Sequence, residues 1–149
     1  KASHAAAAFD GEGARLYGGR WNSPGTALVY TAESEALAAL ELLVHLRAPQ
    51  LLAAYVSIPA DFDEELVQSL AAASLPSGWR RYPAPSALQQ IGDRWVLEAR
   101  SVVLRVPSAV VPRESNFLLN PLHRDFARVA LGRPVPFEFD ARLRPRAGS

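Results

Sequence analysis

The chain has 149 residues, of which 49% are apolar and 21% charged, and its formal net charge is +1. This length and composition are typical of one globular domain with a hydrophobic core, and they exclude disordered and fibrous proteins. A net charge near zero, with acidic and basic residues interspersed, argues against nucleic acid as a direct partner.

In chain order, the first half of the sequence predicts two strands and two helices. Residues 27–31 (ALVYT) are short and apolar, which favours a strand. Residues 34–47 predict a helix, because a serine can cap its start and apolar residues recur on one face. A second strand is expected over residues 51–58 (LLAAYVSI). An Asp and a Glu three positions apart then form a capping-box pattern, which predicts a helix over residues 61–73.

The middle of the chain predicts a loop, a helical stretch and a strand. Residues 75–85 contain three prolines and a glycine, which is typical of a loop. A helical stretch begins at Ser86, and we expect it to break at Gly92 and restart at Asp93. Residues 101–106 (SVVLRV) alternate and are rich in β-branched side chains, which favours a strand.

The last part of the chain predicts one more helix and one more strand. Asn followed by Pro is a common cap and first-turn pair, so residues 120–130 are expected to form a short helix. Residues 137–139 favour a final strand, and residues 142–149 are expected to fray. Because helices and strands mix without strict alternation, we predict a single α+β domain rather than a doubly wound parallel sheet.

Several residue types that carry enzyme chemistry are missing. The sequence has no Cys, and Lys1 is its single lysine, so fifteen of the sixteen basic residues are Arg. These absences exclude thiolate nucleophiles, disulfides, thiolate zinc sites, a P-loop lysine and a buried Schiff-base lysine. Any bound phosphate would therefore be held by Arg and by backbone N–H groups.

The sequence also bears on location. No signal-peptide pattern is visible at its start and no apolar run reaches about 18 residues, so we expect a cytoplasmic protein without a membrane span. Met is absent, from which we expect the natural reading frame to begin before Lys1.

Five of the nine glycines fall within residues 11–25 (GEGARLYGGRWNSPG), so the backbone there turns sharply or lies close to another group. The segment is not the dinucleotide fingerprint, because Leu16 stands where the third Gly is required. Arg20, beside Trp21 and Asn22, is suited to bind phosphate or carboxylate with two hydrogen bonds. The alternative is that Arg20 holds a surface loop in place.

Glu41 falls inside the apolar stripe of its predicted helix, where burying a carboxylate is costly. Either it pairs with an Arg for structural reasons or it faces a cleft. His45 lies one turn later and could form a hydrogen bond with it. The three histidines are too scattered for a metal site, so we predict none.

Three further polar positions are candidates of different kinds. Tyr30 either covers the core or offers its ring to a flat heterocycle. Ser108 follows Pro107 at a strand end, and no Ser-His-acid order or G-x-S-x-G motif surrounds it. A hydrogen-bonding serine is therefore favoured over a nucleophilic one. Asn116 and Asn120 are expected to cap and turn the chain rather than to touch a ligand.

Two blocks of the sequence closely resemble the RES-domain toxins of bacterial RES-Xre type II toxin–antitoxin systems: GGRWNSPGTALVYTAESEALAALELLVHL and VPSAVVPRESNFLLNPLH. The Arg, Glu and Ser that name this family match Arg20, Glu41 and Ser108. Tyr30 matches a fourth site residue of the family. The resemblance runs from Gly11 to about Arg142.

On this resemblance, residues 1–149 form one RES domain whose first strand is expected to lie ahead of residue 1. The resemblance implies an ADP-ribosyltransferase-like fold, with a split mixed β-sheet, surrounding helices and an NAD-binding cleft. It implies that NAD+ is consumed as a substrate by hydrolysis or phosphorolysis, with no cofactor. The alternatives are a protein ADP-ribosyltransferase and a non-catalytic module that binds a partner.

The resemblance also implies partners and residue roles. The partners are an antitoxin with an Xre-type helix-turn-helix and a second copy of the toxin. Arg20, Glu41 and Ser108 would be catalytic, with Glu41 stabilising positive charge on the ribose as the nicotinamide bond breaks. Five residues would bind substrate: Arg20, Trp21, Asn22, Tyr30 and Ser108.

Overall fold

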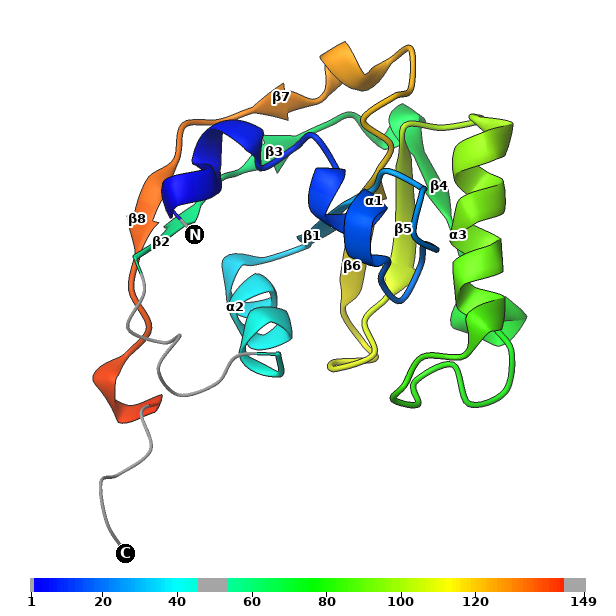
Figure 1. Ribbon diagram of the computed structural model, residues 1–149, viewed down its shortest axis with the longest axis horizontal. Coiled ribbons are helices and arrows are strands. Elements are labelled where there is room, and N and C mark those ends of the chain that lie inside the picture. The colour runs from blue at the N-terminus through cyan, green and yellow to red at the C-terminus, as the bar shows by residue number, and fades with distance from the viewer. Residues whose placement is uncertain (1, 46–53, 144–149) are drawn as a thin grey trace, which may run out of the picture.

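A four-stranded mixed sheet lies at the centre of the fold (Figure 1). In sheet order its strands are β1 (Val29–Ala32), β6 (Ser115–Leu119), β5 (Val103–Pro107) and β4 (Val67–Ser69). β6 is antiparallel to both β1 and β5, whereas β4 is parallel to β5. The computed structural model describes residues 2–45 and 54–143.

In the part of the chain that the structure describes, two small antiparallel pairs lie outside the central sheet. They are β2 (Tyr55–Ser57) with β8 (Val135–Phe137), and β3 (Ala60–Asp61) with β7 (Ala130–Leu131). In Figure 1 both pairs lie to the left of the central sheet, on the side away from the long helix Ser86–Glu98, so the strands form a split arrangement. The predicted α+β class with a split, mixed sheet is confirmed.

Within the described residues, three α-helices and several short 3₁₀ turns surround these strands. The α-helices are α1 (Glu12–Tyr17), α2 (Glu35–Leu43) and α3 (Ser86–Glu98). The 3₁₀ turns are Ala2–Ala7, Glu64–Leu66, Ala72–Ser74, Phe126–Arg128 and Ala141–Leu143. Within residues 2–45 and 54–143, no helix combines the length and apolar character that crossing a bilayer requires.

The core consists of two clusters, one on each face of the central sheet. The strand register explains them, because Tyr30, Leu118 and Leu104 are aligned across the sheet, as are Val29, Leu119 and Val103 on the next rung. The first cluster packs under α3 and the loop before β1: Trp21, Leu28, Leu88, Trp95, Leu104, Val106 and Leu118. The second lies on the opposite face: Val29, Leu66, Val102, Val103, Leu119 and Val129. Burying each large apolar side chain contributes about 1.5–3 kcal/mol.

Several elements form where local signals predicted them. β1 and β5 confirm the strands expected over residues 27–31 and 101–106, each shifted toward the C-terminus. α2 begins at its predicted cap, because the Ser34 hydroxyl accepts a hydrogen bond from the Leu37 amide at 3.1 Å. α2 ends at Leu43, before the expected end, and residues 46 and 47 lie outside the described part of the chain.

The expected break of the third helix is wrong, because α3 runs without interruption from Ser86 to Glu98. Instead, the absence of a side chain at Gly92 allows two elements to lie close together. A Cβ at Gly92 would lie 2.9 Å from the carbonyl carbon of Trp21 and closer still to its oxygen. The glycine therefore allows α3 to contact the backbone of the loop that carries Arg20.

Two predicted helices are wrong, and tertiary contacts explain both. Within residues 61–73, β4 forms a parallel ladder with β5, in which Val67 is aligned with Val103. Within residues 120–130, the Asn120 side chain accepts a hydrogen bond from the Leu122 amide at 3.1 Å and closes a turn. Short 3₁₀ turns and strands follow in place of each helix.

The remaining predictions are partly confirmed. Residues 75–85 contain no helix or strand, as expected. The strand expected over 51–58 is reduced to β2, with residues 51–53 outside the described part, and β8 ends at Phe137 where a strand was expected to run on to Phe139. β6 was missed altogether, although it is a central strand.

Candidate active site

The glycine-rich segment is organised around the buried side chain of Asn22. Its Nδ2 donates to the carbonyl of Ala14 at 2.8 Å and to that of Thr26 at 3.0 Å, while its Oδ1 accepts from the Tyr30 hydroxyl at 2.7 Å. Gly18 and Gly25 adopt positive φ angles of 70° and 106°, which favour glycine at both turns. The segment is thus a fixed loop that presents Arg20.

Tyr30, on β1, joins this loop to the central sheet. Its hydroxyl donates to Asn22 and accepts from the Trp21 amide at 3.0 Å. Burial of the phenol raises the pKa of Tyr30 to about 12, so the hydroxyl stays protonated at neutral pH. A Cβ at Gly19 would lie 2.9 Å from the Tyr30 ring carbon Cζ, so a side chain does not fit there. Tyr30 is nevertheless 41% exposed, which leaves part of its ring open to a ligand.

Arg20 lies half-buried between the glycine-rich segment and the loop of residues 75–85. Its Nη1 donates to the carbonyl of Trp79 at 2.7 Å and to that of Arg81 at 3.3 Å. Burial lowers the pKa of Arg20, and the negative charge of Glu41 acts in the opposite direction. One nitrogen therefore holds the loop, while other N–H donors of the guanidinium have no recorded partner among the described residues and can meet an anion.

Glu41, on α2, is held by two neutral donors. Its Oε1 accepts from the Ser108 hydroxyl at 2.7 Å and from Nδ2 of Asn116 at 2.6 Å. Within the described residues Glu41 forms no salt bridge, so it is not a structural partner of an Arg. These neutral donors fix the carboxylate in position without a direct ion pair, and the nearby positive charge named for it is that of Arg20. His45, exposed beyond the end of α2, plays no recorded part in this arrangement.

Ser108 lies just after β5 and is completely buried, and three hydrogen bonds fix the position of its hydroxyl. Its hydroxyl donates to Glu41 and accepts from the amides of Val110 at 3.1 Å and Val111 at 2.9 Å. An oxygen held by three partners and shielded from solvent orients the carboxylate. This geometry favours the hydrogen-bonding interpretation of Ser108 over a nucleophilic one.

The structure thus brings Arg20, Tyr30, Glu41 and Ser108 into one region from the glycine-rich loop, β1, α2 and the end of β5. Sequence reasoning missed Asn116, which was expected to cap or turn the chain and which instead contacts Glu41 from β6. The signal that could have found it is its place within the block that resembles the RES family. Assigning that segment to a strand would have placed its side chain on the same face as Leu118 and Tyr30.

Trp21 and Asn22 occupy positions that do not support the predicted direct contact with substrate. The Trp21 ring is only 2% exposed and belongs to the core cluster beneath α3, and Asn22 is fully buried. Both hold the Tyr30 hydroxyl through hydrogen bonds. Both residues therefore support Arg20 and Tyr30 from within the fold.

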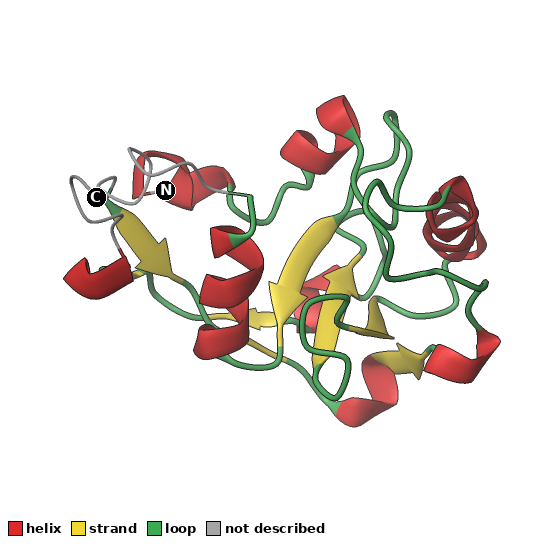
Figure 2. Cartoon of the chain, turned by 90° about the horizontal axis from the view of Figure 1, so that it is seen from below, coloured by secondary structure: helices red, strands yellow, loops and turns green. Residues whose placement is uncertain are grey.

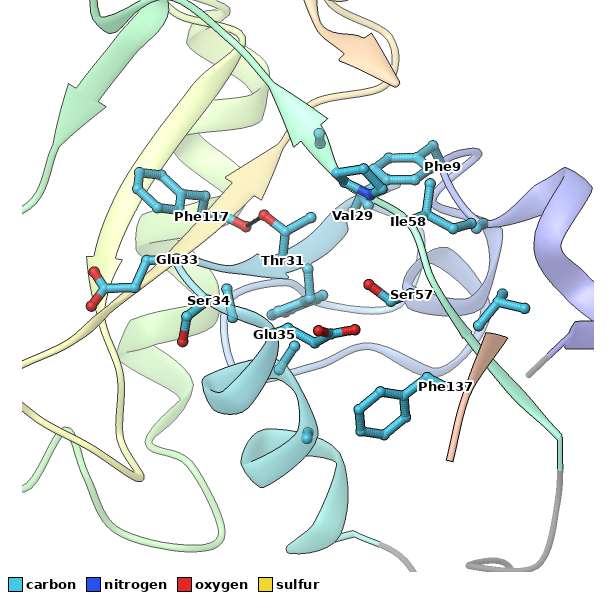
Figure 3. A pocket seen from close by; sticks show the side chains of 18 of the residues that line it. Phe9, Val29, Thr31, Glu33, Ser34, Glu35, Ser57, Ile58, Phe117 and Phe137 are labelled. Atoms are coloured by element: carbon cyan, nitrogen blue, oxygen red, sulfur yellow. Dashed lines mark hydrogen bonds between the residues drawn. The ribbon is translucent and has the colours of Figure 1, made fainter. Parts of the chain in front are cut away.

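A cavity of about 610 Å³ opens beside this region, between α2, β1 and the β2–β8 pair (Figure 3). Figure 2 shows α2 lying between the central sheet and that pair. Of the predicted site residues, only Tyr30 lines the cavity. Glu33, Glu35 and Asp61 also line it, and their charges disfavour a diphosphate group there. Among the predicted site residues, Arg20 is the one whose guanidinium can donate to an anion.

Comparison with known proteins finds a matching family and similar toxins. The RES domain family matches residues 1–140. The chain is 39% identical over 140 residues to a protein named Toxin Res from Yersinia enterocolitica, covering 93% of this chain and 92% of that protein. It is 36% identical over 138 residues to the Prs ADP-ribosylating toxin of a Sphingobium species, covering 91% and 86% of the two chains.

Among solved structures, the fold is similar to that of a chain in the toxin–antitoxin complex MbcT-MbcA of M. tuberculosis. The TM-score is 0.67 at 23% identity, and the match covers 86% of this chain and 76% of that chain. This likeness is consistent with the expected ADP-ribosyltransferase-like arrangement of strands and helices.

Proposed function

This chain belongs to the RES domain family, and from that premise we propose that it is the toxin of a toxin–antitoxin pair that cleaves the bond between nicotinamide and ribose in NAD+. The observation that carries the proposal is the position of Glu41. A carboxylate on an otherwise apolar helix face is held by Ser108 and Asn116, with Arg20 near enough for its pKa to respond to the Glu41 charge.

Cleavage of the bond between nicotinamide and ribose requires from the protein mainly a negative charge in a fixed position. When the N-glycosidic bond breaks, its electron pair moves to the pyridinium nitrogen, and nicotinamide leaves as a neutral molecule. Positive charge develops on the ribose, and a nearby carboxylate lowers the energy of that state. No strong acid, thiolate or lysine is needed, which agrees with a sequence that has no Cys and no internal Lys.

The acceptor completes the reaction in one of two ways. Attack by water forms a C–O bond to the ribose carbon, releases a proton and yields ADP-ribose. Attack by inorganic phosphate forms the corresponding ribose 1-phosphate ester. The chain would thus be an NAD+ glycohydrolase or an NAD+ phosphorylase, and comparing turnover with and without phosphate distinguishes the two.

Two exposed or half-exposed groups support binding of the nicotinamide and the diphosphate of NAD+. The partly exposed ring of Tyr30 provides a stacking surface for nicotinamide, and Arg20 provides donors for the diphosphate. Arg80 lies close by, since its Nε donates to the carbonyl of Ala109 at 3.1 Å, next to Ser108. Ser108 acts through Glu41, while Trp21 and Asn22 act through Tyr30.

The test is nicotinamide release from NAD+ by the purified chain, followed by chromatography. We expect release by the wild-type chain and almost none by Glu41→Gln, which keeps the shape and removes the charge. Circular dichroism and thermal unfolding of the variant provide the control for folding. A wild-type chain that releases no nicotinamide, with or without phosphate, overturns the proposal.

A second candidate function is transfer of ADP-ribose to a protein, which the name of the Sphingobium relative favours. In that case NAD+ labelled on its adenylate would leave label on a protein band from a cell extract. Label that stays entirely in small molecules would exclude transfer.

The proposal that this chain binds a protein partner is supported by the similarity of its fold to a chain of a toxin–antitoxin complex. We propose an antitoxin with an Xre-type helix-turn-helix, two copies of the toxin in the complex, and a cytoplasmic location where NAD+ is at hand. Co-expression with such an antitoxin should restore growth and yield a co-purifying complex. Light scattering of that complex then gives the number of toxin copies.

A further inference from the structure

Asn116 lies on β6, the strand flanked by β1 and β5 in the central sheet. It is aligned with Ala32 on one neighbour and with Val106 on the other, so the sheet fixes its backbone on both sides. Its side chain crosses to α2, where Nδ2 lies 2.6 Å from Oε1 of Glu41.

The chemistry of the partner determines which way the amide of Asn116 faces. An ionised carboxylate accepts hydrogen bonds and donates none, so the NH₂ group of the amide must face Glu41. Its carbonyl oxygen is then directed elsewhere. This Oδ1 is buried and has no hydrogen-bond partner, and it is the one such side-chain atom within residues 2–45 and 54–143.

A buried acceptor without a partner costs stability, and an apolar side chain of the same shape would avoid that cost. Leu is close to Asn in shape, and Leu118 and Leu119 already occupy the same strand. The amide at position 116 therefore combines an unpaired acceptor, which is unfavourable for the fold, with the hydrogen bond that its Nδ2 donates to Glu41.

Asn116 and Ser108 reach the same oxygen from two different elements. Ser108 is fixed by the amides of Val110 and Val111 after β5, and Asn116 is fixed by the ladder of β6. A glutamate side chain has three rotatable bonds, and two donors from a rigid sheet restrict them far more than one donor does.

We propose that Asn116 is a positioning residue for the reaction, which holds the Glu41 carboxylate in the orientation that stabilises charge on the ribose. The inference rests on the proposed function, because it assigns Glu41 its role. Asn116 acts through Glu41 and not by contact with NAD+.

The test compares Asn116→Leu with wild type in the full chain, using nicotinamide release and thermal unfolding. We expect a melting temperature close to that of wild type, since removal of the unpaired acceptor offsets the loss of the hydrogen bond to Glu41. We expect kcat to fall about tenfold or more, as for a catalytic group that has lost its alignment, with KM for NAD+ changed less than about twofold.

Asn120→Leu is the matched control. Asn120 is also buried, but its side chain bonds to the Leu122 amide and the Val96 carbonyl, away from Glu41. This variant should lower the melting temperature and leave kcat per folded molecule unchanged.

Two results would overturn the inference while leaving the proposed function intact. One is an Asn116→Leu variant with wild-type kcat. The other is a variant whose melting temperature and kcat fall together, as expected of a purely structural residue. A wild-type chain without activity on NAD+ refutes the proposed function itself, and this inference with it.

Discussion

Gly92 provides the sharpest stability prediction, because two opposing effects differ in sign there. Replacing a helical Gly by Ala should stabilise α3 by up to about 1 kcal/mol through helix propensity. The new Cβ would, however, lie 2.9 Å from the carbonyl carbon of Trp21 and closer to its oxygen. Either α3 or the loop must then shift by roughly 1 Å within a close-packed interior, which costs about 1–3 kcal/mol.

We therefore expect Gly92→Ala to lower the free energy of unfolding by about 1–2 kcal/mol, or the melting temperature by about 2–8 °C for a chain of this length. Urea unfolding followed by tryptophan fluorescence measures it. The displaced loop carries Arg20, so KM for NAD+ should rise as well. The matched control is Gly13→Ala in α1, where a Cβ would meet no atom within 4 Å and the change should be neutral or stabilising.

A Gly92→Ala variant that is as stable as wild type, or more so, would refute this reasoning. It would mean that helix propensity outweighs the contact with Trp21 and that the loop moves at little cost.

Three further predictions concern the site. Glu41→Gln should reduce kcat by about 10²–10³-fold with little change in melting temperature, which would contradict a structural role. Tyr30→Phe should cost about 1–3 kcal/mol in urea unfolding, because Asn22 Oδ1 and the Trp21 amide lose a buried partner. Burial raises the pKa of Tyr30 to about 12, so the protonated hydroxyl contributes its full stability below about pH 10 and progressively less as the pH rises from about 10 to 12. The Tyr30→Phe variant should lack this loss of stability at alkaline pH. Arg20→Lys should raise KM for NAD+ at unchanged fold, since a lysine lacks the planar pair of donors, and an unchanged KM would remove Arg20 from the anion site.

Local signals were sufficient where an element is determined by its own residues. The Ser34 cap located α2, and apolar runs located β1 and β5. β6 could not be found in this way, because SNFLL begins with two polar residues and is a strand through its ladders with β1 and β5. Similarly, Gly92 has the sequence signature of a break, and only its contact with Trp21 shows why a glycine stands there.

The same distinction applies to the site. Glu41 was identifiable because a carboxylate on an apolar helix face is costly to bury, and Arg20 because of the glycines around it. Asn116 was missed because its strand was missed. Trp21 and Asn22 follow Arg20 directly in sequence, yet their side chains point into the fold, which the order of residues does not reveal.

The order of strands in the central sheet also governs when the site can exist during synthesis. β1 and α2, which carry Tyr30 and Glu41, emerge early, whereas β6 is made much later and pairs with β1 only across a long stretch of chain. Such long-range pairing closes late in folding. Glu41 therefore lacks one or both of its donors until position 116 has been translated, and a nascent or truncated chain that ends earlier would carry the carboxylate without the full set of donors that align it.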